Sequence, residues 1–172
     1  MEIRKSTKHD MGDLLSLFDE ARSTIATLGI NQWQNGYPSR EVVAEDIALA
    51  RSYTVTDEGG ILCGTFVLIE DGEPTYDKIF DGHWQTGDDR CDYVAIHRVA
   101  VSVRMRGKGI STAIIDHAAA RARELGRAAL RIDTHHGNVV MRRMLEKHGF
   151  AYCGVIYLAD GNPRVAYERV LE

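Results

Sequence analysis

Between residues 104 and 109 the chain contains three positive side chains and two glycines, a composition that suits the binding of phosphate groups. The segment reads Arg104, Met105, Arg106, Gly107, Lys108 and Gly109. An apolar, strand-like run precedes it, and a helical pattern opens at Ile110. The first N–H groups of a helix lack intrahelical partners, the helix dipole favours an anion there, and glycine lets the backbone close around a phosphate. The segment is therefore predicted to hold a phosphorylated cofactor.

Two familiar phosphate loops do not fit this segment. A P-loop would need glycine in place of Ser102 and a hydroxyl residue in place of Gly109. A dinucleotide fingerprint fails because Thr112 occupies its third glycine position. What remains is Arg104-x-x-Gly107-x-Gly109 directly after a predicted strand, a pattern that resembles the acetyl-CoA signature of the GNAT superfamily of N-acetyltransferases.

Hydrophobic periodicity and capping residues predict the elements that must position this loop. Helices are predicted at 11–28, from Ser39 as N-cap to about 50, at 109–125 and at 138–148. Strands are predicted near Ile3 and at 52–57, 61–69, 92–101, 128–133, 151–158 and 165–171. This order, β-α-α-β-β-β-α-β-α-β-β, predicts an α/β fold with a mixed central sheet of about seven strands flanked by about four helices, in a single domain over residues 1–172.

A second block of sequence supports the resemblance. Residues 138–150, Asn-Val-Val-Met-Arg-Arg-Met-Leu-Glu-Lys-His-Gly-Phe, resemble the second cofactor motif of the family, which ends in Glu-Lys-x-Gly-Phe. The predicted element order is also that of the GNAT fold, so the resemblance covers nearly the whole chain. Three short stretches resemble a bacterial subgroup of the family. They are residues 97–101, residues 133–135 and the loop from Trp33 to Pro38. The resemblance does not identify the substrate of this subgroup.

The resemblance implies acetyl-CoA as cofactor. The main chain of Val99 and Val101 would pair with the pantetheine arm, and the Val99 N–H would face the acetyl carbonyl, where one such donor is worth about 3–4 kcal/mol. The implied cofactor-binding residues are Val99, Ala100, Val101, Arg104, Arg106, Gly107, Lys108, Gly109, Ile110, Ser111, Thr112 and Asn138. From the residues alone, Arg106 and Lys108 could equally be solvated, and Asn138 could equally cap its helix.

His97 is the first candidate for the general base, because an imidazole suits proton removal from an ammonium group near neutral pH. Alternation along the strand predicts that His97 shares a face with Val99. His135 ends the next predicted strand and is the second candidate, and Asp133 would orient or charge-tune a neighbour. The alternatives are a core role for His97 and a helix-capping role for His135. No metal is predicted, because no carboxylate or cysteine spacing supports a site around these histidines.

The general acid is where the sequence departs from the family. Many members carry a tyrosine seven residues after the motif asparagine, and Leu145 stands there in this chain. Tyr152, Cys153, Tyr157 or solvent would then protonate the thiolate. The departure keeps a second function open, that of a non-catalytic acyl-CoA-binding sensor or assembly module.

The acceptor site is predicted at the loop between the first two helices. Trp33 and Tyr37 lie in this loop, and Pro38 stiffens it. An aromatic-lined mouth with acidic neighbours suits an amine on an apolar or aromatic body. The predicted function is transfer of the acetyl group of acetyl-CoA to a primary amine of a small molecule by direct attack. Both aromatic residues could instead be packing anchors, and a protein amine stays open as an acceptor.

Composition sets further limits. The net charge of −4 divides into −10 for residues 1–97 and +6 for residues 98–172, so the basic half contains the proposed phosphate loop. No dense run of like charge suggests nucleic-acid binding, and no apolar run is long enough for a membrane span. The three scattered cysteines predict no disulfide framework, and a reducing cytoplasm is the expected setting. Homodimers are common in the family, and the sequence leaves this point open.

Overall fold

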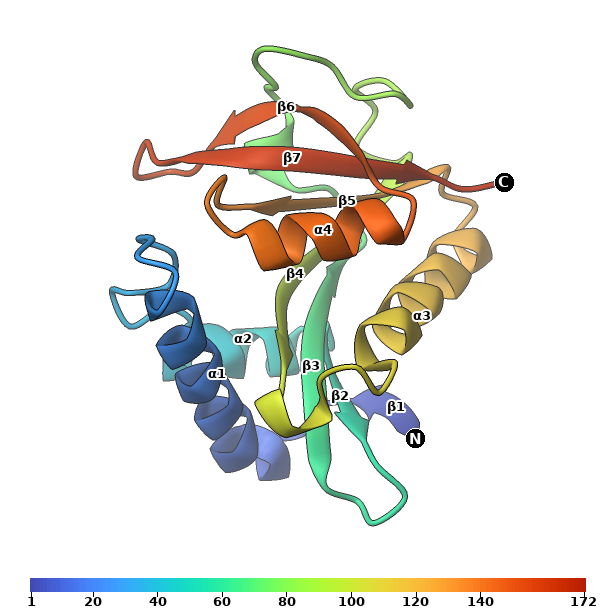
Figure 1. The fold of residues 1–172 in the computed structure, drawn as a ribbon. Coiled ribbons are helices and arrows are strands. Elements are labelled where there is room, and N and C mark those ends of the chain that lie inside the picture. Colours follow the sequence, from blue (N-terminus) through green and yellow to red (C-terminus); the bar gives the residue numbers. More distant parts are fainter. The chain divides into compact units, whose positions relative to one another are not determined.

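A computed structural model describes residues 1–172, in which seven strands form a mixed sheet with the order β1-β2-β3-β4-β5-β7-β6 (Figure 1). The strands are β1 Glu2–Lys5, β2 Ser52–Thr56, β3 Leu62–Ile69, β4 Tyr93–Val101, β5 Ala129–Thr134, β6 Ala151–Tyr157 and β7 Pro163–Val170. The helices are α1 Met11–Ala26, α2 Arg40–Ala48, α3 Ile110–Glu124 and α4 Val139–Lys147. The predicted fold class and element order are confirmed. None of the helices has the length and apolarity needed to span a membrane.

The chain forms two compact units. The first contains residues 1–68 and 98–114, and the second contains residues 69–97 and 115–172. Strand β4 therefore contributes its beginning to the second unit and its end to the first.

In the first unit, α1 and α2 share one apolar core with the end of β4. Its buried members are Leu14, Leu17, Phe18, Val43 and Ala100. Strand β2 pairs antiparallel with β1 on one side and with β3 on the other. The predicted N-cap is confirmed, because the Ser39 side chain accepts a hydrogen bond from the Val42 N–H at 3.3 Å.

Strand β4 contains a break that the alternation argument did not predict. Arg98 has a φ of 50°, in the left-handed region that residues other than glycine seldom adopt. Its guanidinium donates two hydrogen bonds of 2.7 Å to the Asp46 carboxylate and one of 2.5 Å to the Tyr37 hydroxyl. These contacts hold the strained residue in place, as at a β-bulge. The predicted alternation assumes extended backbone throughout, and Arg98 departs from it, so the shared face of His97 and Val99 stays a prediction.

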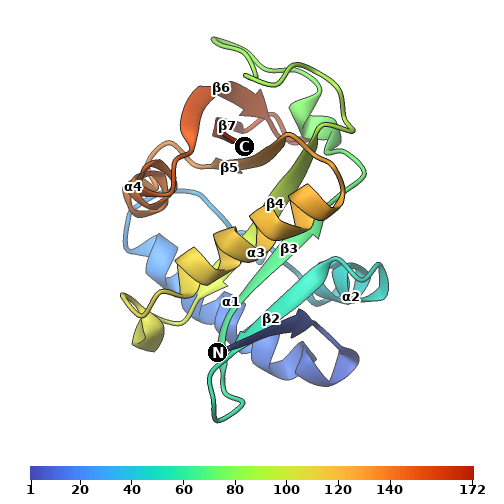
Figure 2. The same ribbon diagram turned by 90° about the vertical axis from the view of Figure 1, so that its right-hand side faces the viewer.

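In the second unit, β5 pairs in parallel with β4 and antiparallel with β7, and β6 pairs antiparallel with β7. Helix α4 lies beside β5, β6 and β7 in both views (Figures 1 and 2). Leu145 of this helix is fully buried, so the residue that replaces the family's tyrosine is a packing residue.

The long polar loop at 70–92 belongs to the second unit and is fastened to the edge strand β6. Phe80 forms an isolated antiparallel bridge with Val155, with backbone hydrogen bonds of 2.8 Å in both directions. At Gly82 the approach to β6 is so close that an added Cβ would lie 1.9 Å from the carbonyl oxygen of Cys153. Only glycine fits there, and the loop is thereby held in a defined path.

Candidate active site

The strand, loop and helix predicted around residues 104–109 are confirmed. Strand β4 ends at Val101, a 3₁₀ turn covers Val103–Met105, and α3 begins at Ile110. Gly107 and Gly109 have φ angles of 74° and 80°, which glycine adopts without strain. An added Cβ at either position would meet no atom within 4 Å, so backbone conformation and not lack of space favours glycine.

Backbone donors and positive side chains are both available on this loop. The N–H groups of Gly107 and Gly109 donate to no acceptor in the protein, and the first N–H groups of a helix such as α3 have no partner within it. Arg104, Arg106 and Lys108 are exposed. Unpaired backbone donors together with three exposed cations fit the diphosphate of a nucleotide cofactor.

The base of the loop is fixed to α1 and β3. The Glu20 carboxylate of α1 accepts hydrogen bonds from the Val103 N–H and, at 3.2 Å, from the Ser102 hydroxyl. The Ser102 N–H donates to the Cys63 carbonyl of β3 at 2.9 Å. The exposed cations therefore project from an anchored turn.

The other residues assigned to the cofactor lie on β4 and in the first turn of α3. On β4, Val99 and Val101 are half-buried, whereas Ala100 is in the core. Ile110 is also in the core, and Ser111 and Thr112 are more exposed.

Strand β4 pairs with β5 at its beginning. The register joins Tyr93 to Ala95 with Ala129 to Arg131, all within the second unit.

His97 in the second unit is paired with a carboxylate. Its Nε2 is buried and lies 3.0 Å from Oε2 of Glu73, an ion-pair distance without the alignment of a hydrogen bond. The ring of Tyr76 stacks on the imidazole, with centroids 5.8 Å apart and planes at 22°. His97 therefore has one ring nitrogen held against an acid and one face against an aromatic ring.

The pKa of Glu73 shows how strongly this contact acts. Burial alone would raise the pKa of the carboxyl group, but the contact with His97 and hydrogen bonds from Thr75 lower it from 4.5 to about 2. Glu73 is therefore an anion at neutral pH, and its charge lies 3.0 Å from Nε2 of His97. A base that must accept a proton gains from this arrangement.

The same contact predicts a loss of stability in acid. Because the folded-state pKa of Glu73 is depressed, its contribution is present above the unfolded value of 4.5 and is lost as the pH falls towards about 2. The shift corresponds to about 3 kcal/mol. We expect the difference in unfolding free energy between wild type and Glu73→Gln to be fully present at pH 5 and above, and to be lost as the pH falls to about 2. Urea denaturation across this range measures it, and a constant difference would contradict the prediction.

Asp133 is connected to His97 through Tyr76. The Tyr76 hydroxyl donates to Oδ1 of Asp133 at 2.6 Å, and burial together with the Asp133 charge raises the pKa of Tyr76 well above its ordinary value. Tyr76 is therefore a neutral donor committed to Asp133. The contact of Asp133 therefore leads through Tyr76 to His97.

His135 makes a separate set of contacts after β5. Its Nδ1 accepts from the Gly137 N–H at 3.0 Å, and its ring stacks on His136 with centroids 4.4 Å apart. Burial, and then the charges of His136 and Arg164, lower the pKa of His135. Asn138 caps α4 by accepting from the Met141 N–H at 3.2 Å, so its predicted capping role is confirmed.

The two aromatic residues of the predicted acceptor loop lie together in the first unit. Trp33 contacts Phe18 edge-on at 5.8 Å and Tyr37 at 6.4 Å between ring centroids. The Tyr37 hydroxyl accepts from Arg98, and the Tyr37 carbonyl accepts from Arg22 at 3.1 Å. The loop is thus anchored at both residues, and their contact with an acceptor stays a prediction.

Comparison with known proteins places this architecture in a family. The model of the Acetyltransferase (GNAT) family matches residues 18–150. No curated protein sequence matches the chain. A GNAT family acetyltransferase from Streptococcus agalactiae 2603 is 32% identical, with a TM-score of 0.88 over 99% of this chain and 95% of that one.

More distant structures share the fold alone. A GNAT family acetyltransferase from Listeria monocytogenes 4b F2365 is 21% identical, with a TM-score of 0.71 over 99% of this chain and 94% of that one. A ribosomal-protein-alanine N-acetyltransferase from Brucella melitensis is 17% identical, with a TM-score of 0.66 over 99% of this chain and 100% of that one. On the family match and the similarity to the streptococcal protein, the chain belongs to the GNAT family of acetyltransferases.

Proposed function

We propose that this protein is an acetyl-CoA-dependent N-acetyltransferase that acetylates a primary amine of a small molecule by direct attack. Membership of an acetyltransferase family supports the reaction class. The observation that carries the proposal is the loop at 104–109, with its left-handed glycines, unpaired N–H groups and exposed cations. Its three unpaired cysteines fit a reducing compartment such as the cytoplasm.

In this proposal the cofactor supplies an acetyl thioester, and the chain contacts the cofactor from its diphosphate to its acetyl group. Residues 104–109 and the first turn of α3 bind the diphosphate, and Asn138 adds a polar contact. The backbone of residues 99–101 aligns the pantetheine arm. The Val99 N–H donates a hydrogen bond where negative charge develops on the carbonyl oxygen, which is worth about 3–4 kcal/mol.

His97 is the proposed general base. The Glu73 carboxylate at Nε2 favours a proton on that nitrogen, which leaves Nδ1 to accept the proton of the ammonium group. His97 comes two residues before Val99 in the chain, so β4 supplies both the base and the oxyanion donor. His135 suits the role less, because its Nδ1 already accepts a backbone hydrogen bond and its surroundings disfavour the protonated ring.

The departing thiolate takes its proton from solvent in this proposal. Leu145 occupies the place of the family's tyrosine and is buried, and the Tyr76 hydroxyl is already donated to Asp133. A CoA thiolate is a fair leaving group, so a positioned acid is not required.

The test is an acetyl-transfer assay on a panel of acceptors. The purified protein is incubated with acetyl-CoA and aliphatic amines, aromatic amines or a peptide with a free N-terminus, while free thiol is detected and products are identified by mass spectrometry. We expect thiol release that depends on a small primary amine and yields its N-acetyl product. Reaction with the peptide alone would overturn the small-molecule assignment. Binding of CoA without thiol release on any acceptor would favour the sensor, the function that Leu145 keeps open.

A further inference from the structure

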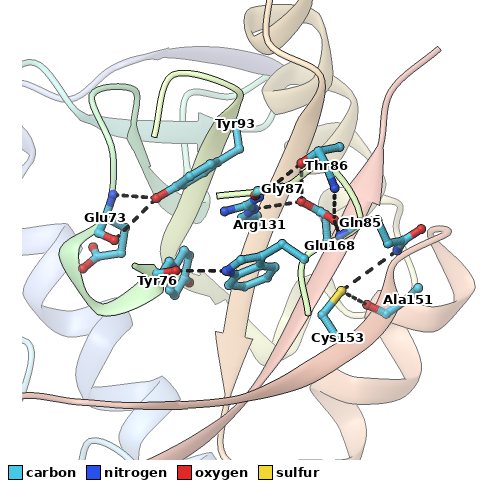
Figure 3. Close-up of polar contacts among 11 residues, drawn as sticks. Glu73, Tyr76, Gln85, Thr86, Gly87, Tyr93, Arg131, Ala151, Cys153 and Glu168 are labelled. Atoms are coloured by element: carbon cyan, nitrogen blue, oxygen red, sulfur yellow. Dashed lines mark hydrogen bonds and ion pairs between the residues drawn. The ribbon is translucent and has the colours of Figure 1, made fainter. Parts of the chain in front are cut away.

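A buried ion pair that the proposed reaction does not use lies in the second unit. The Arg131 side chain of β5 is 1% exposed and the Glu168 side chain of β7 is fully buried, with Nε of Arg131 2.8 Å from Oε1 of Glu168 (Figure 3). Burying two charges carries a desolvation penalty of several kcal/mol per ion, and apolar residues of similar volume are often as stable. The pair is therefore not explained by the stability of the sheet alone.

The pair fastens residues 85–87 of the long loop to the sheet. Glu168 accepts hydrogen bonds from the N–H groups of Gln85, at 2.5 Å, and Thr86, at 3.2 Å. Its other oxygen accepts from the Thr86 hydroxyl at 2.7 Å, and Arg131 donates to the Gly87 carbonyl at 2.5 Å (Figure 3). Backbone groups of the loop thus satisfy both charges.

Two aromatic rings enclose the Arg131 guanidinium. Its central carbon lies 4.2 Å from the ring centroid of Trp84 and 4.1 Å from that of Tyr93, so a cation stands between two π faces. Each ring then makes a polar contact at its far end. Trp84 Nε1 donates to the Tyr76 carbonyl at 2.9 Å, and the Glu73 N–H donates to the Tyr93 hydroxyl at 2.9 Å.

These two contacts end on the two residues that hold His97. Glu73 supplies the carboxylate at Nε2, and Tyr76 supplies the stacked ring. One arm from Arg131 therefore passes through Tyr93 to Glu73, and a second passes through Trp84 to Tyr76.

We propose that the Arg131–Glu168 pair and the two rings around it are a positioning element that holds Glu73 and Tyr76 against His97. The inference rests on the proposed function only in that His97 acts as the base. A purely structural role would change stability and nothing else, whereas a positioning role acts on the reaction through Glu73 and on the protonation pattern of the His97 ring.

The sharpest test removes one arm and leaves the charges in place. Tyr93→Phe keeps the ring on Arg131 but deletes the hydroxyl that accepts from the Glu73 N–H. This hydroxyl accepts from the Glu73 N–H at 2.9 Å and donates to the Glu73 carbonyl at 3.4 Å, so the variant loses two hydrogen bonds to the backbone of Glu73. Their loss predicts a kcat about three- to tenfold lower, with KM for acetyl-CoA unchanged. Because the effect passes through Glu73, the double variant Tyr93→Phe with Glu73→Gln should be no slower than Glu73→Gln alone. Multiplying effects would overturn the proposal.

Tyr167→Phe is the matched control. Tyr167 is fully buried in the same unit, and its hydroxyl accepts a 2.9 Å hydrogen bond from Arg142, so this variant loses one part-buried hydrogen bond, against two in Tyr93→Phe. No contact of that hydroxyl leads to the long loop. We expect its stability to fall as in Tyr93→Phe while kcat stays at the wild-type value. An equal loss of kcat in both variants would make the role of Tyr93 structural.

NMR of the histidine ring nitrogens gives a readout that needs no acceptor. In the wild type we expect neutral His97 to carry its proton on Nε2, beside Glu73. In Tyr93→Phe, and in Arg131→Lys, which keeps the charge but not the planar stacking, a mixture of both tautomers should appear. An unchanged tautomer in a folded variant would overturn the proposal. If the tautomer responds but no acceptor is acetylated, the proposed function fails while the positioning role stands.

Discussion

Replacing His97 by alanine should lower kcat by about 10²–10⁴-fold, the usual contribution of a positioned general base, while the affinity for acetyl-CoA stays the same. The physical reason is that an amine is charged near neutral pH and cannot attack before it loses a proton. The variant should also lose the pH dependence that a general base gives the wild-type rate near neutral pH. Steady-state kinetics with an identified acceptor, measured as a function of pH, check both expectations.

Two further histidine variants test whether a lower kcat in His97→Ala reflects the loss of the general base. His83 is exposed in the long loop at 70–92, and His83→Ala should keep the wild-type rate and pH profile. If His97→Ala keeps its rate and pH dependence, His97 is a structural residue. His135→Ala would then be the variant to measure, because His135 is the second candidate for the base.

The helices and strands that carry the site could be predicted because residues close to their ends determine where they begin and end. Ser39 and Asn138 both accept the hydrogen bonds expected of an N-cap, and the left-handed Gly126 and Gly149 follow α3 and α4. Predicted bounds of α3, 109–125, differ from the observed Ile110–Glu124 by one residue at each end. Periodicity and caps depend on neighbours within a turn or two, so one sequence contains them.

The contacts around His97 could not be predicted in the same way. Nothing in the sequence near Glu73 or near His97 showed that the two side chains would meet. The left-handed Arg98 depends on Asp46, 52 residues earlier in the chain, and a strand pattern gives no sign of it. Such features are determined by partners brought together only by the fold.

The Arg131–Glu168 pair is the clearest example of a contact that could not be predicted from the sequence. Each residue lies in a predicted strand, and charged residues in strands are ordinarily expected at the surface. Both are buried because the long loop supplies their remaining hydrogen-bond partners. A sequence pattern records which positions are polar, but not which of them a distant loop will cover.

Replacing Gly107 by glutamate should weaken CoA binding about a hundredfold or more, which corresponds to about 3 kcal/mol. A Cβ added at Gly107 meets no atom within 4 Å, so the protein leaves room for the carboxylate in the space where the proposed diphosphate lies. Two like charges about 4 Å apart near a protein surface repel by about 4 kcal/mol. Calorimetric titration with CoA measures the loss, and unchanged affinity would refute the assignment of the loop.

Strain must be separated from charge in this experiment, because Gly107 has a φ of 74° and any side chain there is disfavoured by about 1–2 kcal/mol. Gly107→Ala carries the strain without the carboxylate, and its CoA affinity should stay within a few-fold of wild type. Gly126→Glu carries both the strain and the carboxylate, at a φ of 67° and with open space around an added Cβ. It follows the C-terminal end of α3 and is not part of the loop. This variant should lose similar stability and bind CoA normally. Only repulsion at the loop predicts that pattern, since general damage to the fold would weaken binding in all three variants.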